Sequence, residues 1–172
     1  MTKESFDSRV LAEVAVSVAL AYVLNLIIVY SLPQGGSITL GSMVPILLLA
    51  LRRGPKIGIF GGTIFGLVQM FLGGYWYTVA QVLLDYPVAF ACLGLAGFFR
   101  SKPIIGVVVS ITGRFIAHFA SGVIFFGMWA PPELGPYLYS AIYNGSYLLP
   151  ELAISAVLIF LLLKRGILNY YL

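Results

Sequence analysis

The stretch PIIGVVVSITGRFIAHFASGVIFFGM, residues 103–128, is almost entirely apolar. At a rise of about 1.5 Å per residue, a helix of this length crosses the roughly 30 Å hydrocarbon layer of a bilayer. Two ionisable side chains, Arg114 and His118, lie inside it. Because such groups are costly in lipid, a run that keeps them predicts a transmembrane helix with a structural or functional use for each.

The rest of the chain has the same character. It contains 60% hydrophobic and only 9% charged residues, with a mean hydropathy of +1.01, whereas soluble domains carry about 25% charged residues. The 172 residues fit one integral membrane domain, 1–172, and leave no room for a nucleotide-binding domain. The lone cysteine, Cys92, excludes disulfide frameworks and cysteine-based metal sites, so we expect no metal.

From residues 103–128 and the apolar runs on either side of them, we predict an all-α bundle of six transmembrane helices in the plasma membrane. The predicted helices are approximately 10–30, 37–51, 55–72, 76–99, 103–128 and 136–163. Nine of the ten basic residues then fall on one side of the membrane, which the positive-inside rule makes cytoplasmic. Both termini are therefore expected in the cytoplasm.

The second predicted helix, 37–51, is short for a full crossing. It lies between the turn Pro33-Gln34-Gly35-Gly36 and the pair Arg52-Arg53. We therefore expect the preceding loop, 32–38, to dip into the membrane, where irregular backbone is tolerated only if protein buries it or it lines a cavity. This makes Gln34, Gly35 and Gly36 the centre of a candidate lid.

Two ionisable residues at matching depth predict an ion pair. Counting from Lys102 and Lys164 respectively, Arg114 and Glu151 lie at similar depth on consecutive antiparallel helices. We predict that they neutralise one another within the membrane.

Asp85 and His118 share a second level, nearer the outer side. Aromatic and amide groups surround that level on the expected fold: Tyr75, Tyr77, Gln81 and Tyr86, with Tyr139, Tyr143, Asn144 and Tyr147 from the sixth helix. Such a set predicts a binding cavity for a small flat ligand with hydrogen-bond donors and a possible positive charge. Catalysis fits poorly, because no Ser-His pair or acidic cluster is evident from spacing.

Five motifs, in order along the chain, resemble the thiamine-specific substrate-binding (S) component of energy-coupling-factor (ECF) transporters. They are PQGGS (33–37), MVPILLLALRRG (43–54), LLDY (83–86), HFASG (118–122) and YSAIYN (139–144). The resemblance covers essentially the whole chain. It implies a six-helix S-component fold that binds thiamine from outside with high affinity, and not an enzyme.

The resemblance also implies roles for individual residues. Asp85 takes the place of the pocket carboxylate, with Tyr86 beside it and Tyr75 at the outer mouth. His118 and Phe126 flank the ligand rings. Tyr139 and Asn144 hydrogen-bond the aminopyrimidine. Tyr143 lies beside Asn144 on the helical stripe formed by residues 140, 143, 144 and 147.

Partners follow from the same resemblance. Ala15 and Ala19, a small-residue face whose spacing alone is a weak signal, match the motif that docks on a transmembrane coupling protein, while two separate ATPase subunits hydrolyse ATP. No nucleic-acid partner and no cofactor are expected.

The chain departs from some relatives at three positions. It has Asp85 in place of Glu, Phe126 in place of Trp, and Leu40 in place of an acidic residue. The last two changes affect the expected contacts to the thiazolium and hydroxyethyl side of the ligand.

Two alternatives stay open from the sequence. One is an S component for another vitamin or precursor, such as riboflavin or hydroxymethylpyrimidine. The other is a stand-alone carrier that uses Asp85, His118 or Glu151 for proton coupling.

Overall fold

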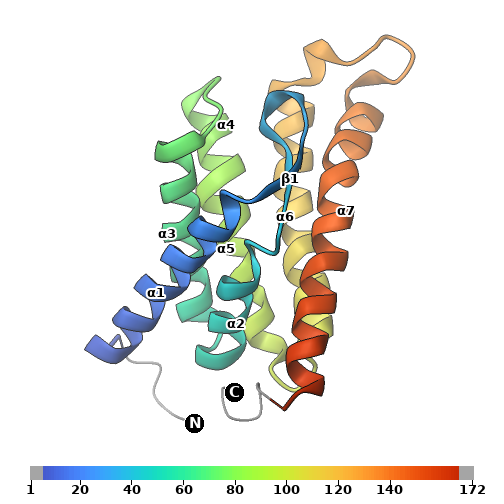
Figure 1. Ribbon diagram of the computed structural model, residues 1–172. Coiled ribbons are helices and arrows are strands. Elements are labelled where there is room, and N and C mark those ends of the chain that lie inside the picture. Colours follow the sequence, from blue (N-terminus) through green and yellow to red (C-terminus); the bar gives the residue numbers. More distant parts are fainter. Residues whose placement is uncertain (1–5, 167–172) are drawn as a thin grey trace.

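The structure, a computed structural model, describes residues 6–166 as a helical bundle with one small β-hairpin (Figure 1). Within that range, five helical segments are long and apolar enough to span a membrane. They are α1 (Ser8–Asn25), α3 (Pro55–Gly73), a composite segment Val79–Phe99, α6 (Pro103–Phe125) and α7 (Gly135–Lys164). The predicted helical membrane fold is confirmed at this level.

Local sequence signals explain where these helices begin. The Asp7 carboxylate caps α1 by accepting from the Val10 N–H at 2.8 Å. Pro55 and Pro103 occupy the first turns of α3 and α6, where a missing N–H costs no hydrogen bond. Between α2 (Val44–Arg53) and α3, Gly54 adopts a φ of 93°, which a glycine accommodates without strain and which allows an abrupt reversal.

The first two predicted helices are wrong in their bounds. The first ends at Asn25 instead of residue 30, and the second begins at Val44 instead of residue 37. Between them lie β1 (Ile28–Ser31), the turn η1 (Pro33–Gly35) and β2 (Ser37–Thr39), with Ser31 paired to Ser37. A β-branched, aromatic run before a Pro-Gly turn favours a strand as strongly as a membrane helix, and apolar length alone does not distinguish the two.

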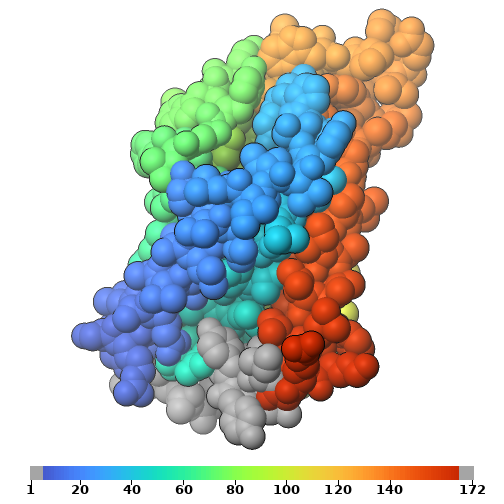
Figure 2. All heavy atoms as spheres, in the orientation of Figure 1, coloured from blue at the N-terminus to red at the C-terminus, as the bar shows by residue number. Residues whose placement is uncertain are grey.

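Helix α2 has only 10 residues, about 15 Å of helix, yet it lies at the centre of the bundle. Ile46, Leu47, Leu49, Ala50 and Leu51 are completely buried. The hairpin continues from its N-terminal end and lies across the face of the bundle between the green α3–α4 region and the red α7 (Figure 2). The predicted lid loop is thus the tip of this hairpin.

The composite segment consists of α4 (Val79–Leu83), η2 (Leu84–Val88), α5 (Ala89–Ala91) and η3 (Cys92–Phe99). In η2 the helix widens into a π-type turn that contains Pro87, which has no N–H to donate. Such turns often occur at functional sites, and this one carries Asp85 and Tyr86.

Glycines of α3 allow this segment to pack very closely. A methyl group at Gly62 would overlap the Phe90 carbonyl oxygen, and one at Gly66 would overlap the Tyr86 carbonyl. The backbone of η2 therefore rests directly on α3, which fixes the position of the two site residues that it carries.

The basic connections gather at one end of the bundle, together with the start of α1 and the end of α7 (Figure 1). Arg53 forms a bidentate pair with Glu13 of α1, with Nε–Oε2 at 2.7 Å. Arg100 donates to the carbonyls of Leu51 and Arg52. These contacts join α1, α2 and the end of η3.

Candidate functional site

A cavity of about 410 Å³ lies between the hairpin, η2, α6, α7 and the adjoining ends of α1 and α3. All eight residues predicted to contact a ligand line it: Tyr75, Asp85, Tyr86, His118, Phe126, Tyr139, Tyr143 and Asn144. The lid residues Gln34, Gly35 and Gly36 line it as well. Residues that are up to 110 positions apart in sequence therefore meet around one space.

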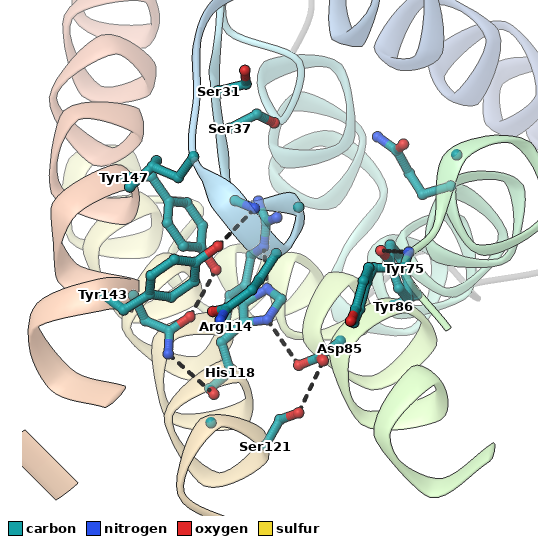
Figure 3. A pocket seen from close by; sticks show the side chains of 18 of the residues that line it. Ser31, Ser37, Tyr75, Asp85, Tyr86, Arg114, His118, Ser121, Tyr143 and Tyr147 are labelled. Atoms are coloured by element: carbon teal, nitrogen blue, oxygen red, sulfur yellow. Dashed lines mark hydrogen bonds and ion pairs between the residues drawn. The ribbon is translucent and has the colours of Figure 1, made fainter. Parts of the chain in front are cut away.

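Asp85 is the centre of the polar wall (Figure 3). Its Oδ2 accepts from Gln81 Nε2 at 2.6 Å and from Ser121 Oγ at 2.9 Å, and its Oδ1 lies 3.1 Å from His118 Nδ1. Within residues 6–166, no lysine or arginine nitrogen lies within 4.0 Å of this carboxylate. Its hydrogen bonds come from neutral amide and hydroxyl groups and from the imidazole.

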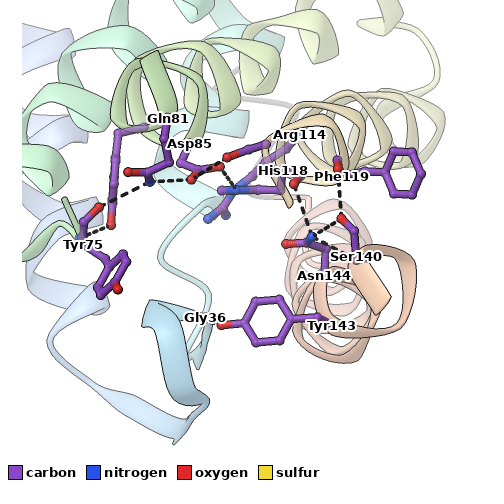
Figure 4. Close-up of polar contacts among 12 residues, drawn as sticks. Gly36, Tyr75, Gln81, Asp85, Arg114, His118, Phe119, Ser140, Tyr143 and Asn144 are labelled. Atoms are coloured by element: carbon purple, nitrogen blue, oxygen red, sulfur yellow. Dashed lines mark hydrogen bonds and ion pairs between the residues drawn. The ribbon is translucent and has the colours of Figure 1, made fainter. Parts of the chain in front are cut away.

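The protonation of the His118 ring follows from the hydrogen bond at its second nitrogen, Nε2. Arg114 Nε donates to His118 Nε2 at 3.2 Å, so Nε2 is an acceptor and the imidazole carries its single hydrogen on Nδ1, facing Asp85. The side chains form a chain from guanidinium through neutral imidazole to carboxylate (Figure 4). Arg114 is also held over the Phe90 ring, 4.1 Å from its centroid, and contacts the Met43 sulfur.

The predicted Arg114–Glu151 ion pair is not formed. In the part of the chain that the structure describes, no nitrogen of Arg114 lies within 4.0 Å of Glu151, and each group has other partners. Glu151 Oε1 accepts from the backbone N–H and the hydroxyl of Thr39 in β2. Sequence spacing fixes the depth of each side chain but not its direction around the helix axis, and Glu151 turns toward the hairpin.

Two tyrosines of α7 hold the hairpin tip. The Tyr143 hydroxyl accepts from Gly36 N–H at 3.0 Å and donates to the Pro33 carbonyl, and Tyr139 donates to Gln34 Oε1 at 3.2 Å. Because these tyrosines also line the cavity, the hairpin tip is hydrogen-bonded directly to the cavity wall.

Asn144 connects α7 to α6. Its amide nitrogen donates to the Ser140 and His118 carbonyls at 3.0 and 3.2 Å, and its Oδ1 accepts from the Tyr147 hydroxyl at 2.9 Å. One lone pair of Oδ1 is left for a ligand.

Aromatic rings surround the mouth. Phe126 lies 6.0 Å from Tyr75 and 5.5 Å from Trp129, measured between ring centroids. The backbone N–H of Tyr75 donates to the Tyr86 hydroxyl at 2.7 Å, which ties the loop after α3 to η2.

Sequence reasoning missed two members of the Asp85 network. The sequence assigned no individual role to Ser121 or to Gln81, yet both donate to the carboxylate. Gln81 precedes Asp85 by four residues, so a shared helical face was the available signal. Ser121 donates to Asp85 and not to the imidazole, which is not the arrangement of a Ser-His nucleophile.

Three other predicted features lie outside the cavity lining. Ala15 and Ala19 are exposed and border a shallow apolar groove between α1 and α3, together with Phe60 and Ile64. Leu40 is 51% exposed and does not line the cavity.

The chain matches a family model along most of its length. Residues 11–168 match the family described as "Thiamine transporter protein (Thia_YuaJ)". It is 37% identical over 171 residues to "Thiamine transporter ThiT" of Bacillus subtilis, with 88% of each chain covered. It is 28% identical over 141 residues to the protein of the same name from Lacticaseibacillus paracasei, with 70% of each chain covered.

A solved structure of ThiT from Listeria monocytogenes superposes on this fold with a TM-score of 0.83. The two chains are 27% identical, and the match covers 91% of this chain and 94% of that one. Fold, cavity and sequence thus agree with the resemblance seen in the five motifs. The chain, a multi-pass membrane protein, belongs to the thiamine transporter protein family.

Proposed function

We propose that this protein captures thiamine in the cavity as the substrate-binding component of an ECF-type importer. The observation that carries the proposal is the Asp85 carboxylate, which neutral donors hold in an aromatic-walled cavity of about 410 Å³. Thiamine has two linked flat rings and one fixed positive charge. Among the described residues no Arg or Lys pairs directly with this carboxylate. It provides complementary charge, and the faces of the tyrosines and Phe126 provide stacking surfaces.

The contacts fit the aminopyrimidine ring at the α6–α7 wall. Asn144 Oδ1 has one lone pair available, and Asp85 has at most one more acceptor position after its three existing partners. Both can accept from the amino group, while His118 and Phe126 flank the rings. Tyr139 already donates to Gln34, so its hydroxyl accepts from the ligand in this arrangement.

Calorimetric titration of the detergent-solubilised protein, without nucleotide, tests the proposal. We expect submicromolar thiamine binding, with much weaker binding of riboflavin and hydroxymethylpyrimidine. Tighter binding of either of these ligands than of thiamine would assign the cavity to that ligand instead. Proton-driven uptake by this protein alone in liposomes would make it a secondary carrier.

The proposal includes a single domain, 1–172, with six membrane crossings and cytoplasmic termini. Helix α2 and the hairpin together form the second crossing, since α2 alone spans about 15 Å. In a Cys92→Ser background, Lys102→Cys and Glu133→Cys should react with a membrane-impermeant maleimide from opposite sides. Labelling from the same side would contradict this topology.

Inward delivery requires docking on a transmembrane coupling protein with two ATPase subunits. The groove beside Ala15 and Ala19 is exposed and apolar, as a lipid-embedded helix contact requires. Ala15→Leu with Ala19→Leu should abolish ATP-dependent uptake in the reconstituted complex and leave thiamine affinity unchanged. Uptake at the wild-type rate would place the docking surface elsewhere.

A further inference from the structure

A second polar feature lies on the α1–α3 wall of the cavity, where Asn25, the last residue of α1, meets Gln69 of α3. Asn25 Nδ2 donates to Gln69 Oε1 at 3.1 Å, and both side chains line the cavity. Gln69 is only 9% exposed. No described hydrogen bond joins this pair to the Asp85–His118 network, whose members come from the composite segment and α6.

The hydrogen-bonding capacity of the pair is only partly used. The shared bond uses one N–H of Asn25 and one lone pair of Gln69. Among residues 6–166, neither the Gln69 amide nitrogen nor the Asn25 carbonyl oxygen has a hydrogen-bond partner. Gln69 is buried and Asn25 half-buried, and both face the cavity, so an unpartnered donor beside an unpartnered acceptor points to a ligand group.

We propose that the Asn25–Gln69 pair is a subsite for a neutral hydroxyl group of the ligand. This inference rests on the proposed function, in which the ligand is thiamine and the hydroxyl is that of its hydroxyethyl substituent. A hydroxyl both donates and accepts, so it matches Asn25 Oδ1 and Gln69 Nε2 together. The charged residues of the cavity, Asp85 and Arg114, belong to η2 and α6, so the α1–α3 wall offers only neutral partners.

The orientation of the ligand agrees with this assignment. If the aminopyrimidine lies at the α6–α7 wall, beside Asn144, the substituent on the other ring is directed away from that wall. Asn25 and Gln69 are polar lining residues of the same cavity on elements other than α6 and α7.

The competing explanation is a structural clip, meaning that the Asn25–Gln69 hydrogen bond only holds α1 to α3. Hydrogen bonds between membrane helices stabilise the fold without touching any ligand. The two explanations differ in what they predict for ligands that do or do not carry the hydroxyl. A clip affects every ligand equally, whereas a subsite acts only on the one with the hydroxyl.

The test is a cycle of two proteins and two ligands. Calorimetry compares thiamine with the analogue that has ethyl in place of hydroxyethyl, on wild type and on Gln69→Met, which keeps the side-chain length but removes the amide. We expect wild type to prefer thiamine about three- to tenfold, as one neutral hydrogen bond provides. In Gln69→Met this preference should disappear, with affinity for the ethyl analogue changed less than twofold.

Asn25→Leu, which removes the other amide of the pair, should also abolish the preference for thiamine. This variant replaces Gln69→Met in the test if Gln69→Met does not fold. Thr63→Val is the control on α3, because Thr63 donates to the Ile59 carbonyl and does not line the cavity. A wild-type protein with no preference, or equal losses for both ligands in the variants, overturns the subsite while leaving thiamine binding intact. Failure of wild type to bind either ligand overturns the proposed function and the subsite with it.

Discussion

Arg114 Nε donates to His118 Nε2 at 3.2 Å, and through this contact a residue that does not touch Asp85 sets the orientation of one that does. Without the guanidinium, Nε2 would lose its donor and the imidazole could reverse its two nitrogens. Arg114→Lys keeps the charge but not the planar Nε group. We expect it to weaken thiamine binding about three- to tenfold.

Nitrogen NMR of the imidazole distinguishes positioning from simple loss of stability. The protein has a single histidine, so the ring signals belong to His118. We expect the hydrogen on Nδ1 in wild type and a mixture of tautomers in Arg114→Lys. Unchanged ring signals with weakened binding would mean that Arg114 acts on the ligand by another route.

Asp85 carries the largest single polar contribution in the proposed site. Asp85→Asn removes the charge from its hydrogen bond to the ligand, and we expect thiamine affinity to fall by about one to two decades, or about 1.5–3 kcal/mol. Ser121→Ala removes only one of the donors to the carboxylate and should cost much less. Equal effects of the two variants, measured by calorimetry, would exclude a direct ligand contact for Asp85.

The sequence predicted the membrane fold and the cavity wall because both depend on quantities that apolar length and helical periodicity encode. Residues 103–128 are apolar for the length of a bilayer, and the stripe Ser140, Tyr143, Asn144 and Tyr147 recurs at the period of a helix. The eight ligand contacts that the family resemblance implies also line this cavity.

The sequence could not predict the direction of a side chain around its helix axis, nor which short segments pair as strands. The apolar character of residues 28–31 fits the end of a helix as well as it fits a strand. The hairpin forms because these residues pair with residues 37–39. Glu151 hydrogen-bonds Thr39 and does not form the ion pair with Arg114 that its spacing predicted. The Asn25–Gln69 contact joins residues 44 positions apart that no periodicity relates.

Tyr143 should control how long the ligand stays bound. Tyr143→Phe leaves the Gly36 N–H and the Pro33 carbonyl without their partner, which frees the hairpin tip. We expect the dissociation rate of thiamine to rise about five- to tenfold. Tyr137→Phe is the control on the same helix, since Tyr137 is 68% exposed and does not line the cavity.

Stopped-flow tryptophan fluorescence can follow this step, because Trp129 packs against Phe126 at the cavity mouth, with 5.5 Å between ring centroids. An equal rise in both variants would show that the hairpin tip does not retain the ligand.

Gly66 should be required for the position of Asp85 and Tyr86. A methyl group there overlaps the Tyr86 carbonyl, so Gly66→Ala forces η2 away from α3. Overpacking of this kind costs about 1–3 kcal/mol of unfolding free energy. We expect a lower Tm and weaker thiamine binding in Gly66→Ala. Gly145→Ala, in α7, adds a carbon with no neighbouring residue's atom within 4 Å and does not line the cavity, so it should lower neither.

Glu151 and Thr39 should behave as one unit that anchors the base of the hairpin to α7. Glu151 is 2% exposed, and its Oε1 accepts two hydrogen bonds from Thr39, so removing either partner leaves a buried polar group unsatisfied. In Glu151→Leu with Thr39→Val, the second substitution should cost much less than it does alone. Thermal unfolding in detergent should give a coupling of about 0.5–3 kcal/mol.

The same measurement on Arg114→Leu with Glu151→Leu discriminates between the two possible partners of the carboxylate. Because the structure places these side chains on separate hydrogen-bond networks, we expect their costs to add to within about 0.5 kcal/mol. Strong coupling between Arg114 and Glu151 but none between Glu151 and Thr39 would restore the ion pair expected from sequence spacing. The hairpin would then be held by its tip alone, through Tyr139 and Tyr143.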